Sequence, residues 1–267
     1  MSLAEVLLQQ VINGLALGMM YALLALGFTM VYGIIELINF AHFSVFTLGT
    51  FIGIVVLQVI GITDSSKAMS GLPLVGTLVL VFGATMLLSG VVGVVIERVC
   101  LRPMRGVSGT APMITTIGVS FIVLNVVLMI WGPQTQPFPR IIPDVRWPLI
   151  GQAEVTLRLF LLCGAGLVLM VALNYLVRRT ALGKAMRATA QDADAAQMMG
   201  VDVDRIVMLT FFLGSALAGA GSLVFGFYYG FTAFYIGYTT GLRAFTSAVL
   251  GGIGNIPGAV LGASSSG

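Results

Sequence analysis

Seven runs of about 20 or more mostly apolar residues constrain the fold of this 267-residue chain. A helix needs about 20 such residues to cross the roughly 30 Å hydrocarbon core of a bilayer. Backbone amides in lipid must pair within their own segment, so the runs predict helices, and the strict alternation of a membrane β-barrel is missing. We therefore predict an all-α, polytopic transmembrane helical bundle of about seven spans, at residues 11–35, 38–62, 72–96, 111–131, 157–177, 206–229 and 241–262.

The composition supports a membrane-embedded surface. Charged residues make up 9% of the chain and hydrophobic residues 58%, whereas soluble domains carry about 25% charged residues. Contact with the lipid bilayer removes the need for a charged surface. The net charge of +3 does not indicate nucleic-acid binding, because no basic run is interleaved with stacking aromatic residues.

Few residues could support catalysis. Cys100 and Cys163 have no metal-ligand spacing, so we interpret them as small buried or lipid-facing side chains, and one histidine cannot build a histidine metal site. Gly183 and Lys184 do not form a phosphate-binding loop, because Ala185 follows and the first glycine is missing. We expect no enzyme activity, no cofactor and no metal, so the energy for any pumping must come from a partner or an ion gradient.

Basic residues predict the orientation. They collect in two loops separated by two crossings, as expected if both loops face the cytoplasm: Arg98, Arg102 and Arg105 in the first, and Arg178, Arg179, Lys184, Arg187 and Arg205 in the second. This places the N-terminus and the proline-rich loop 132–156 outside. The first run is expected to be retained, since no basic segment of a cleavable signal precedes it. The short link at Glu36 is either a cytoplasmic turn or part of a broken helix.

Asn39 and His42 are polar residues that open the second run and share one helical face. Polar groups at membrane depth tend to face the bundle interior or a water-filled path. Two interpretations stay open: a hydrogen bond between helices near the membrane edge, and direct contact with a substrate or proton.

Small residues mark two further segments. Glycine, alanine and serine recur every four residues in the sixth run, which predicts close helix packing, at Gly214, Ala218, Ser222, Gly226 and Gly230. In the last run, Gly254, Asn255 and Pro257 predict a kinked or unwound stretch. Such breaks line the substrate path in some transporters and serve packing alone in other membrane proteins.

A short helix is predicted at residues 193–199. Asp192 is a good N-cap and Gly200 a good terminator. The side chains between them are mostly small or flexible, which suits a helix that docks into a groove of another protein. A solvated helix without a partner is the alternative.

Asp194, Ala195, Ala196 and Gly200 have the spacing of the EAA-x-x-x-G loop of ABC-importer permeases, with aspartate in place of glutamate. More specifically, the chain resembles the branched-chain amino acid permeases of the LivH type over nearly its whole length. The matching stretches are 13–18, 21–23, 38–42, 97–98 with 102–103, 115–118, 183–188, 200–201 and 251–259.

The resemblance implies a permease architecture in a bacterial inner (plasma) membrane. Two related permeases would form the pore, two cytoplasmic ATPase subunits would hydrolyse ATP, and a periplasmic or extracytoplasmic substrate-binding protein would deliver branched-chain or related amino acids. Asp194, Ala195, Ala196 and Gly200 would belong to a cytoplasmic coupling loop at about 178–205, seated in the ATPase subunit. Phe43 replaces the family's usual glycine after His42, so we expect a local difference in backbone geometry.

The resemblance also leads us to divide the chain into a transmembrane permease domain, 1–262, and a flexible polar tail, 263–267. Family members continue past Gly262 into an eighth helix, so we expect that this chain is either truncated there or an atypical gene product. The alternative function is an ion-coupled secondary transporter for a small polar solute. The few ionisable residues inside the spans disfavour that alternative, since they offer little to bind a coupling proton.

Overall fold

The computed structural model describes residues 3–35, 37–62, 68–105, 107, 110–150 and 153–250. Nine α-helices make up most of this part of the chain: α1 (Leu3–Ile35), α2 (Ala41–Val59), α3 (Leu72–Ile96), α4 (Ala111–Trp131), α5 (Leu157–Arg179), α6 (Ala181–Gln191), α7 (Ala193–Met198), α8 (Val203–Tyr229) and α9 (Ile236–Leu250). A π-helical turn (Glu97–Leu101) and a 3-10 turn (Arg102–Met104) continue α3. The strands are β1 (Gln136–Pro137), β2 (Arg146–Ile150), β3 (Ala153–Thr156) and β4 (Phe231–Thr232).

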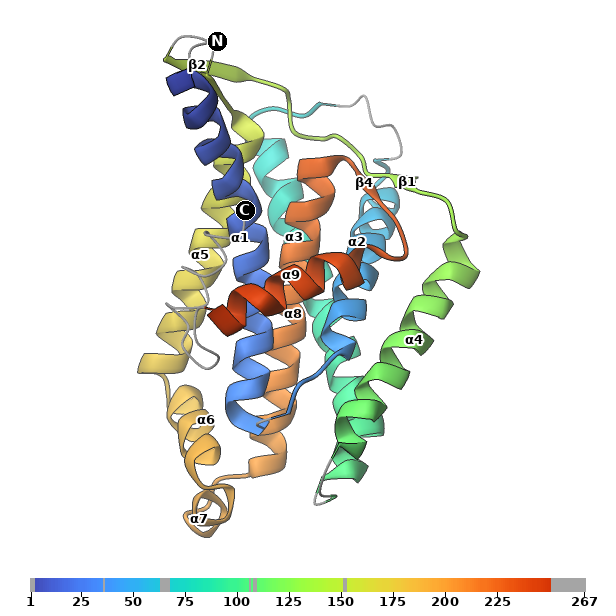
Figure 1. Cartoon of the computed structure of the whole chain (residues 1–267), viewed down its shortest axis with the longest axis vertical. Coiled ribbons are helices and arrows are strands. Elements are labelled where there is room, and N and C mark those ends of the chain that lie inside the picture. Colours follow the sequence, from blue (N-terminus) through green and yellow to red (C-terminus); the bar gives the residue numbers. More distant parts are fainter. Residues whose placement is uncertain are drawn as a thin grey trace.

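Six helices in the described ranges are long and apolar enough to cross a membrane: α1, α2, α3 with its extension, α4, α5 and α8. Their bounds match the first six predicted runs within three residues, except that α1 begins eight residues earlier and the extension of α3 ends eight residues later. This agreement confirms the helical membrane bundle. The seventh run, 241–262, is described only as far as Leu250. Its described part belongs to α9, a 15-residue helix that starts at Ile236 and lies across the bundle (Figure 1). Gly254, Asn255, Pro257 and the predicted tail 263–267 lie outside the described residues.

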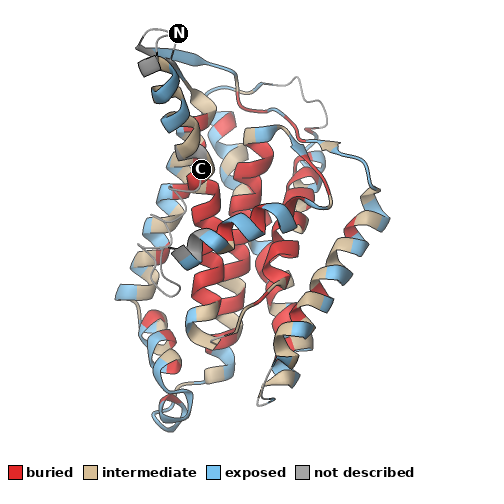
Figure 2. Cartoon of the chain, viewed as in Figure 1, coloured by how far each residue is buried: buried red, intermediate tan, exposed pale blue. Residues whose placement is uncertain are grey.

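The bundle is organised around α8, which is buried along most of its length together with much of α1 and α2 (Figure 2). Small residues let its backbone approach three neighbours. A Cβ atom built on Gly27 of α1 would lie 2.5 Å from the carbonyl oxygen of Gly214. A Cβ on Gly93 of α3 would lie 2.1 Å from the hydroxyl of Ser215, and one on Gly49 of α2 would lie 2.5 Å from that of Ser222. The predicted close packing of the sixth run is therefore present.

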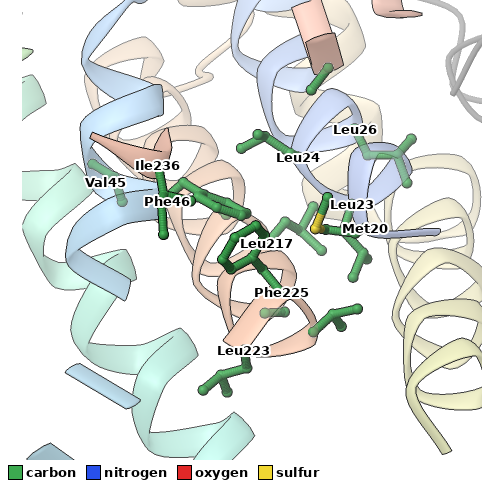
Figure 3. Packing of buried hydrophobic residues seen from close by; sticks show 14 of the residues in the cluster. Met20, Leu23, Leu24, Leu26, Val45, Phe46, Leu217, Leu223, Phe225 and Ile236 are labelled. Carbon is green, nitrogen blue, oxygen red and sulfur yellow. The ribbon is translucent and has the colours of Figure 1, made fainter. Parts of the chain in front are cut away.

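Large side chains fill the space next to these close approaches. Figure 3 shows Met20, Leu23 and Leu24 of α1 with Phe46 of α2 and Leu223 of α8, all buried in one cluster. In contrast, α4 and α5 keep many apolar side chains exposed, as expected of helices that face lipid or another subunit (Figure 2).

The two ends of the bundle differ. The short helices α6 and α7 extend beyond one end, and the irregular loop that carries β1, β2 and β3 covers the other (Figure 1). β2 pairs with β3 and β1 with β4, both antiparallel. The buried ring of Phe138 anchors the loop, because it packs where Gly226 and Gly53 have no side chain.

Replacing Gly93 by leucine should destabilise the bundle, because the new side chain would collide with Ser215 and with the carbonyl of Phe211. Overpacking of this kind costs about 1–3 kcal/mol. Gly83 lies on the same helix with nothing within 4 Å of its Cβ position, so Gly83→Leu is the matched control. Thermal unfolding in detergent should show a lower midpoint for Gly93→Leu alone, and equal midpoints for the two variants would contradict this packing.

Candidate functional site: the coupling end and the start of α2

The segment 192–201 folds into a short helix that is capped at both ends. The side chain of Asp192 accepts a hydrogen bond of 2.9 Å from the amide of Ala195, which satisfies a free donor of the first turn. At the other end, the amide of Gly200 donates to the carbonyl of Gln197 and that of Val201 to Ala196, each at 3.0 Å. Gly200 has φ +87°, so this pair of bonds is a Schellman motif that ends the helix.

Most side chains of α7 are exposed, as expected of a helix that docks on another protein. Asp194, Ala195 and Gly200 are exposed, whereas Ala196 is 5% exposed and forms the inner side of the helix. Met198 and Met199 are 87% and 85% exposed. Two adjacent, flexible apolar side chains open to solvent are what an adaptable protein contact requires.

The helix α6, which precedes α7, is fixed to the end of α5. Gly183 lies so close to the end of α5 that a Cβ would sit 2.1 Å from the carbonyl oxygen of Val177. The guanidinium of Arg187 donates to that same carbonyl. Thr180 caps α6 by accepting a bond of 3.1 Å from the amide of Gly183. The α6–α7 unit, residues 181–198, is thus tied to the end of α5.

A network of ion pairs joins α3 to the start of α8 at the same end. Arg102 and Arg105 both bond to the carboxylate of Asp204, and Arg105 also bonds to Glu97. The side chain of Glu97 is 2% exposed, so Arg105 supplies the charge that permits its burial. Because Asp204 follows α7 by a few residues, this network connects the segment after α7 to the membrane-spanning helix α3.

The sequence alone did not identify this network. Asp204 is 99 residues from Arg105, and no local pattern links them. A π-helical turn at Glu97–Leu101 lies just before Arg102 and Arg105, and such turns are frequent at functional sites.

Asn39 and His42 both lie inside the bundle. The ring nitrogen Nε2 of His42 is 3.3 Å from the carbonyl oxygen of Leu24, and His42 is 1% exposed. Leu24 precedes the end of α1 by 11 residues, or about 16 Å at 1.5 Å per residue, so this contact lies well within the length of α1. In this conformation the contact made by His42 is a hydrogen bond between helices.

Asn39 shapes the backbone that leads into α2. Its side-chain oxygen accepts a bond of 3.1 Å from the amide of Ala41. The amide of Phe40 donates to the hydroxyl of Thr116 on α4, at 3.2 Å. The helix consequently begins at Ala41, and the residues before it are not helical. Non-helical backbone at membrane depth occurs where it is buried in protein or lines a water-filled cavity.

Phe43, which we expected to alter the local backbone, lies in the regular helix α2. Space for its ring comes from α9, because a Cβ on Gly241 would lie 2.4 Å from that ring. The bulk at position 43 is therefore accommodated by a glycine on the facing helix.

At the opposite end, charged side chains surround the β2–β3 hairpin. Arg146 donates to Asp144 at 2.8 Å and to Glu154 at 3.3 Å. The hydrogen bond from Arg146 lowers the pKa of Asp144 below its ordinary value. In the described part of the chain, no three His, Cys, Asp or Glu side chains form a group that could hold a metal ion.

These features define a class: a polytopic helical membrane protein with a short, capped and exposed helix at one end of its bundle. Residues 10–265 match the family model of the branched-chain amino acid transport system permease component, and the chain belongs to this family.

The relatives agree with this assignment. The chain is 37% identical over 261 residues to the high-affinity branched-chain amino acid transport system permease protein BraD of Pseudomonas aeruginosa, covering 96% of this chain and 82% of the relative. It is 36% identical over 263 residues to LivH of Escherichia coli, with the same coverage. A probable LivH of Methanocaldococcus jannaschii is 27% identical over 251 residues, or 90% of this chain and 72% of that protein. No solved structure matches.

Breaking the ion network should destabilise the coupling end. Arg105→Ala would leave the buried carboxylate of Glu97 without its partner, at a cost of about 3 kcal/mol. Adding Glu97→Gln should restore much of the loss, because the neutral amide needs no counter-charge. A double-mutant cycle on thermal unfolding measures the coupling, and additive effects of the two changes would contradict the pairing.

Proposed function

We propose that this chain is the path-forming and coupling subunit of a binding-protein-dependent ABC importer for branched-chain or related amino acids. The observation that carries the proposal is the capped segment 192–201, which exposes Met198 and Met199 beyond the bundle. The helix before it, α6, is tied to α5, and α8 follows it directly. Family membership and the names of the relatives support the amino-acid substrate. Neither supports the ion-coupled alternative.

In this proposal the end that bears α6 and α7 faces the cytoplasm of a bacterial cell, and the membrane is the inner membrane. Both basic loops lie at this end, as the positive-inside rule requires. The loop with the β2–β3 hairpin then faces the substrate-binding protein outside. Residues 1–262 form the permease domain, which pairs with a second, related permease.

The coupling loop, 178–205, is proposed to seat in one of two ATPase subunits, with Asp194, Ala195, Ala196 and Gly200 in its docking helix. A rigid element is needed here, because movement of the ATPase can reach the spans only through parts that do not bend. Asp202 caps α8 by accepting a bond of 3.0 Å from the amide of Arg205. Asp204, two residues on, holds both arginines of the α3 extension. A displacement of α7 would thus be passed to α8 and α3 together.

The translocation path is proposed to pass the start of α2, where Asn39 and His42 lie. Asn39 holds the non-helical residues before Ala41, and His42 holds this part of α2 against α1. Gly254, Asn255 and Pro257 stay in the proposal as path residues on sequence grounds alone. This subunit supplies no ATP chemistry in the proposal.

A glutamate at position 198 tests the docking surface. Met198→Glu places a charge where the proposal has an apolar contact, so the ATPase should no longer co-purify with the permease. Val145→Glu is the matched control, because Val145 is also exposed but lies in the loop at the other end. Retained ATPase in the Met198→Glu complex, or equal loss in both variants, would contradict the assignment of α7.

A further inference from the structure

The helix α9 packs across the middle of the bundle through an apolar and glycine-rich face. Gly237 and Gly241 lie against Phe43, and the amide of Gly237 donates to the hydroxyl of Thr47 at 2.9 Å. Farther along, the ring of Phe245 lies 5.3 Å from that of Phe28 in α1, edge to face. Figure 1 shows the helix crossing α1 and α8 about halfway between the two ends.

The outward face of α9 carries polar side chains, including a charged one, beside the exposed apolar residues Leu242 and Val249. Tyr238, Thr239, Arg243 and Thr246 are exposed, and Arg243 donates to the hydroxyl of Tyr21 at 3.2 Å. Charged and polar groups at membrane depth are costly in hydrocarbon and face a bundle interior or a water-filled cavity. This face of α9 therefore adjoins water or protein rather than lipid.

A groove of about 490 Å³ lies beside this face, between α9, α4 and the start of α2. Aromatic rings supply much of its wall, from Phe40, Phe43, Phe121, Phe234, Tyr235 and Tyr238. Ser120 and Asn125 add polar groups from α4, and Asn125 is exposed with its amide donating to the carbonyl of Phe121 at 2.8 Å. An exposed asparagine within a span is a second sign that this side does not face lipid.

We propose that this groove receives the apolar side chain of the transported amino acid as it passes the start of α2. The inference rests on the proposed import function and names a substrate contact for it. Sites for small molecules are concave, mainly apolar, of roughly 300–1,000 Å³, and carry a few polar groups. The groove meets each condition. The described residues that line it include no charged side chain, so these walls would select for an apolar side chain and hold it weakly enough for release, as a transport path requires.

Filling the groove tests the proposal in the reconstituted complex of permeases, ATPase and binding protein. Leu124 lines the groove, and Ile122 lies on the same helix outside the lining, 65% exposed. Leu124→Trp should lower ATP-dependent leucine uptake at least about tenfold, since small volume changes in an apolar pocket have effects of this size. Ile122→Trp should transport normally. Wild-type uptake by Leu124→Trp, or equal loss of uptake in both variants, would overturn the proposal that the groove receives the substrate side chain.

Chemical labelling of a cysteine in the groove is a second test, and it still tests the proposal if the Leu124→Trp complex fails to assemble. In a background with Cys100 and Cys163 replaced by alanine, Ser120→Cys should react with a charged methanethiosulfonate reagent, whereas Ile122→Cys should not. Leucine should slow the reaction during turnover with binding protein and ATP. Failure of Ser120→Cys to react would show lipid or another subunit in the groove. Reaction that leucine leaves unchanged would show water alone, and both results reject the inference.

The controls separate this inference from the proposed function. A wild-type complex that takes up no leucine with ATP would refute the import proposal itself. If the wild-type complex transports leucine and the Leu124→Trp complex transports it equally well, only the proposed role of the groove would be refuted.

Discussion

Close packing of backbones around α8 is the constraint on which the rest of the structure depends. Helices in a membrane gain little from the hydrophobic effect when they associate, so van der Waals contact between backbones must hold them together. The approach of Gly27 to Gly214, and of Gly93 to Ser215, brings α1 and α3 onto α8. Once these three helices are fixed, α2 fits on their side, α9 lies across the middle, and α4 and α5 remain at the periphery.

The same central helix connects the two candidate functional regions. Its first turn is capped by Asp202 and carries Asp204, the partner of two arginines from the α3 extension. About 10 residues on, the helix reaches the level where α1 and α2 bury His42. In the proposed function, α8 would be a direct mechanical route from an ATPase partner at the α7 end to a substrate path at the start of α2. In this account, transport depends on displacement of packed helices and not on chemistry within the chain.

The sequence predicted those features that local rules decide. Six spans followed from apolar length, and α7 followed from Asp192 and Gly200, since both caps act within four residues. Features set by distant contacts could not be predicted. The start of α2 depends on Thr116, 76 residues away, and the burial of Glu97 depends on Arg105, whose other partner is Asp204. His42 bonds to a backbone carbonyl, which no residue type reveals. The sequence did not predict that α9 lies across the bundle, because the length of an apolar run indicates only that the run can cross the membrane.

The central claim is that this chain provides path and coupling surface while a partner supplies the energy. The most direct test is uptake of radiolabelled leucine into proteoliposomes that hold the complete complex, with binding protein outside and ATP inside. The account predicts accumulation that needs ATP and is indifferent to proton and sodium gradients. Accumulation by this chain without the ATPase, driven by an ion gradient, would contradict it.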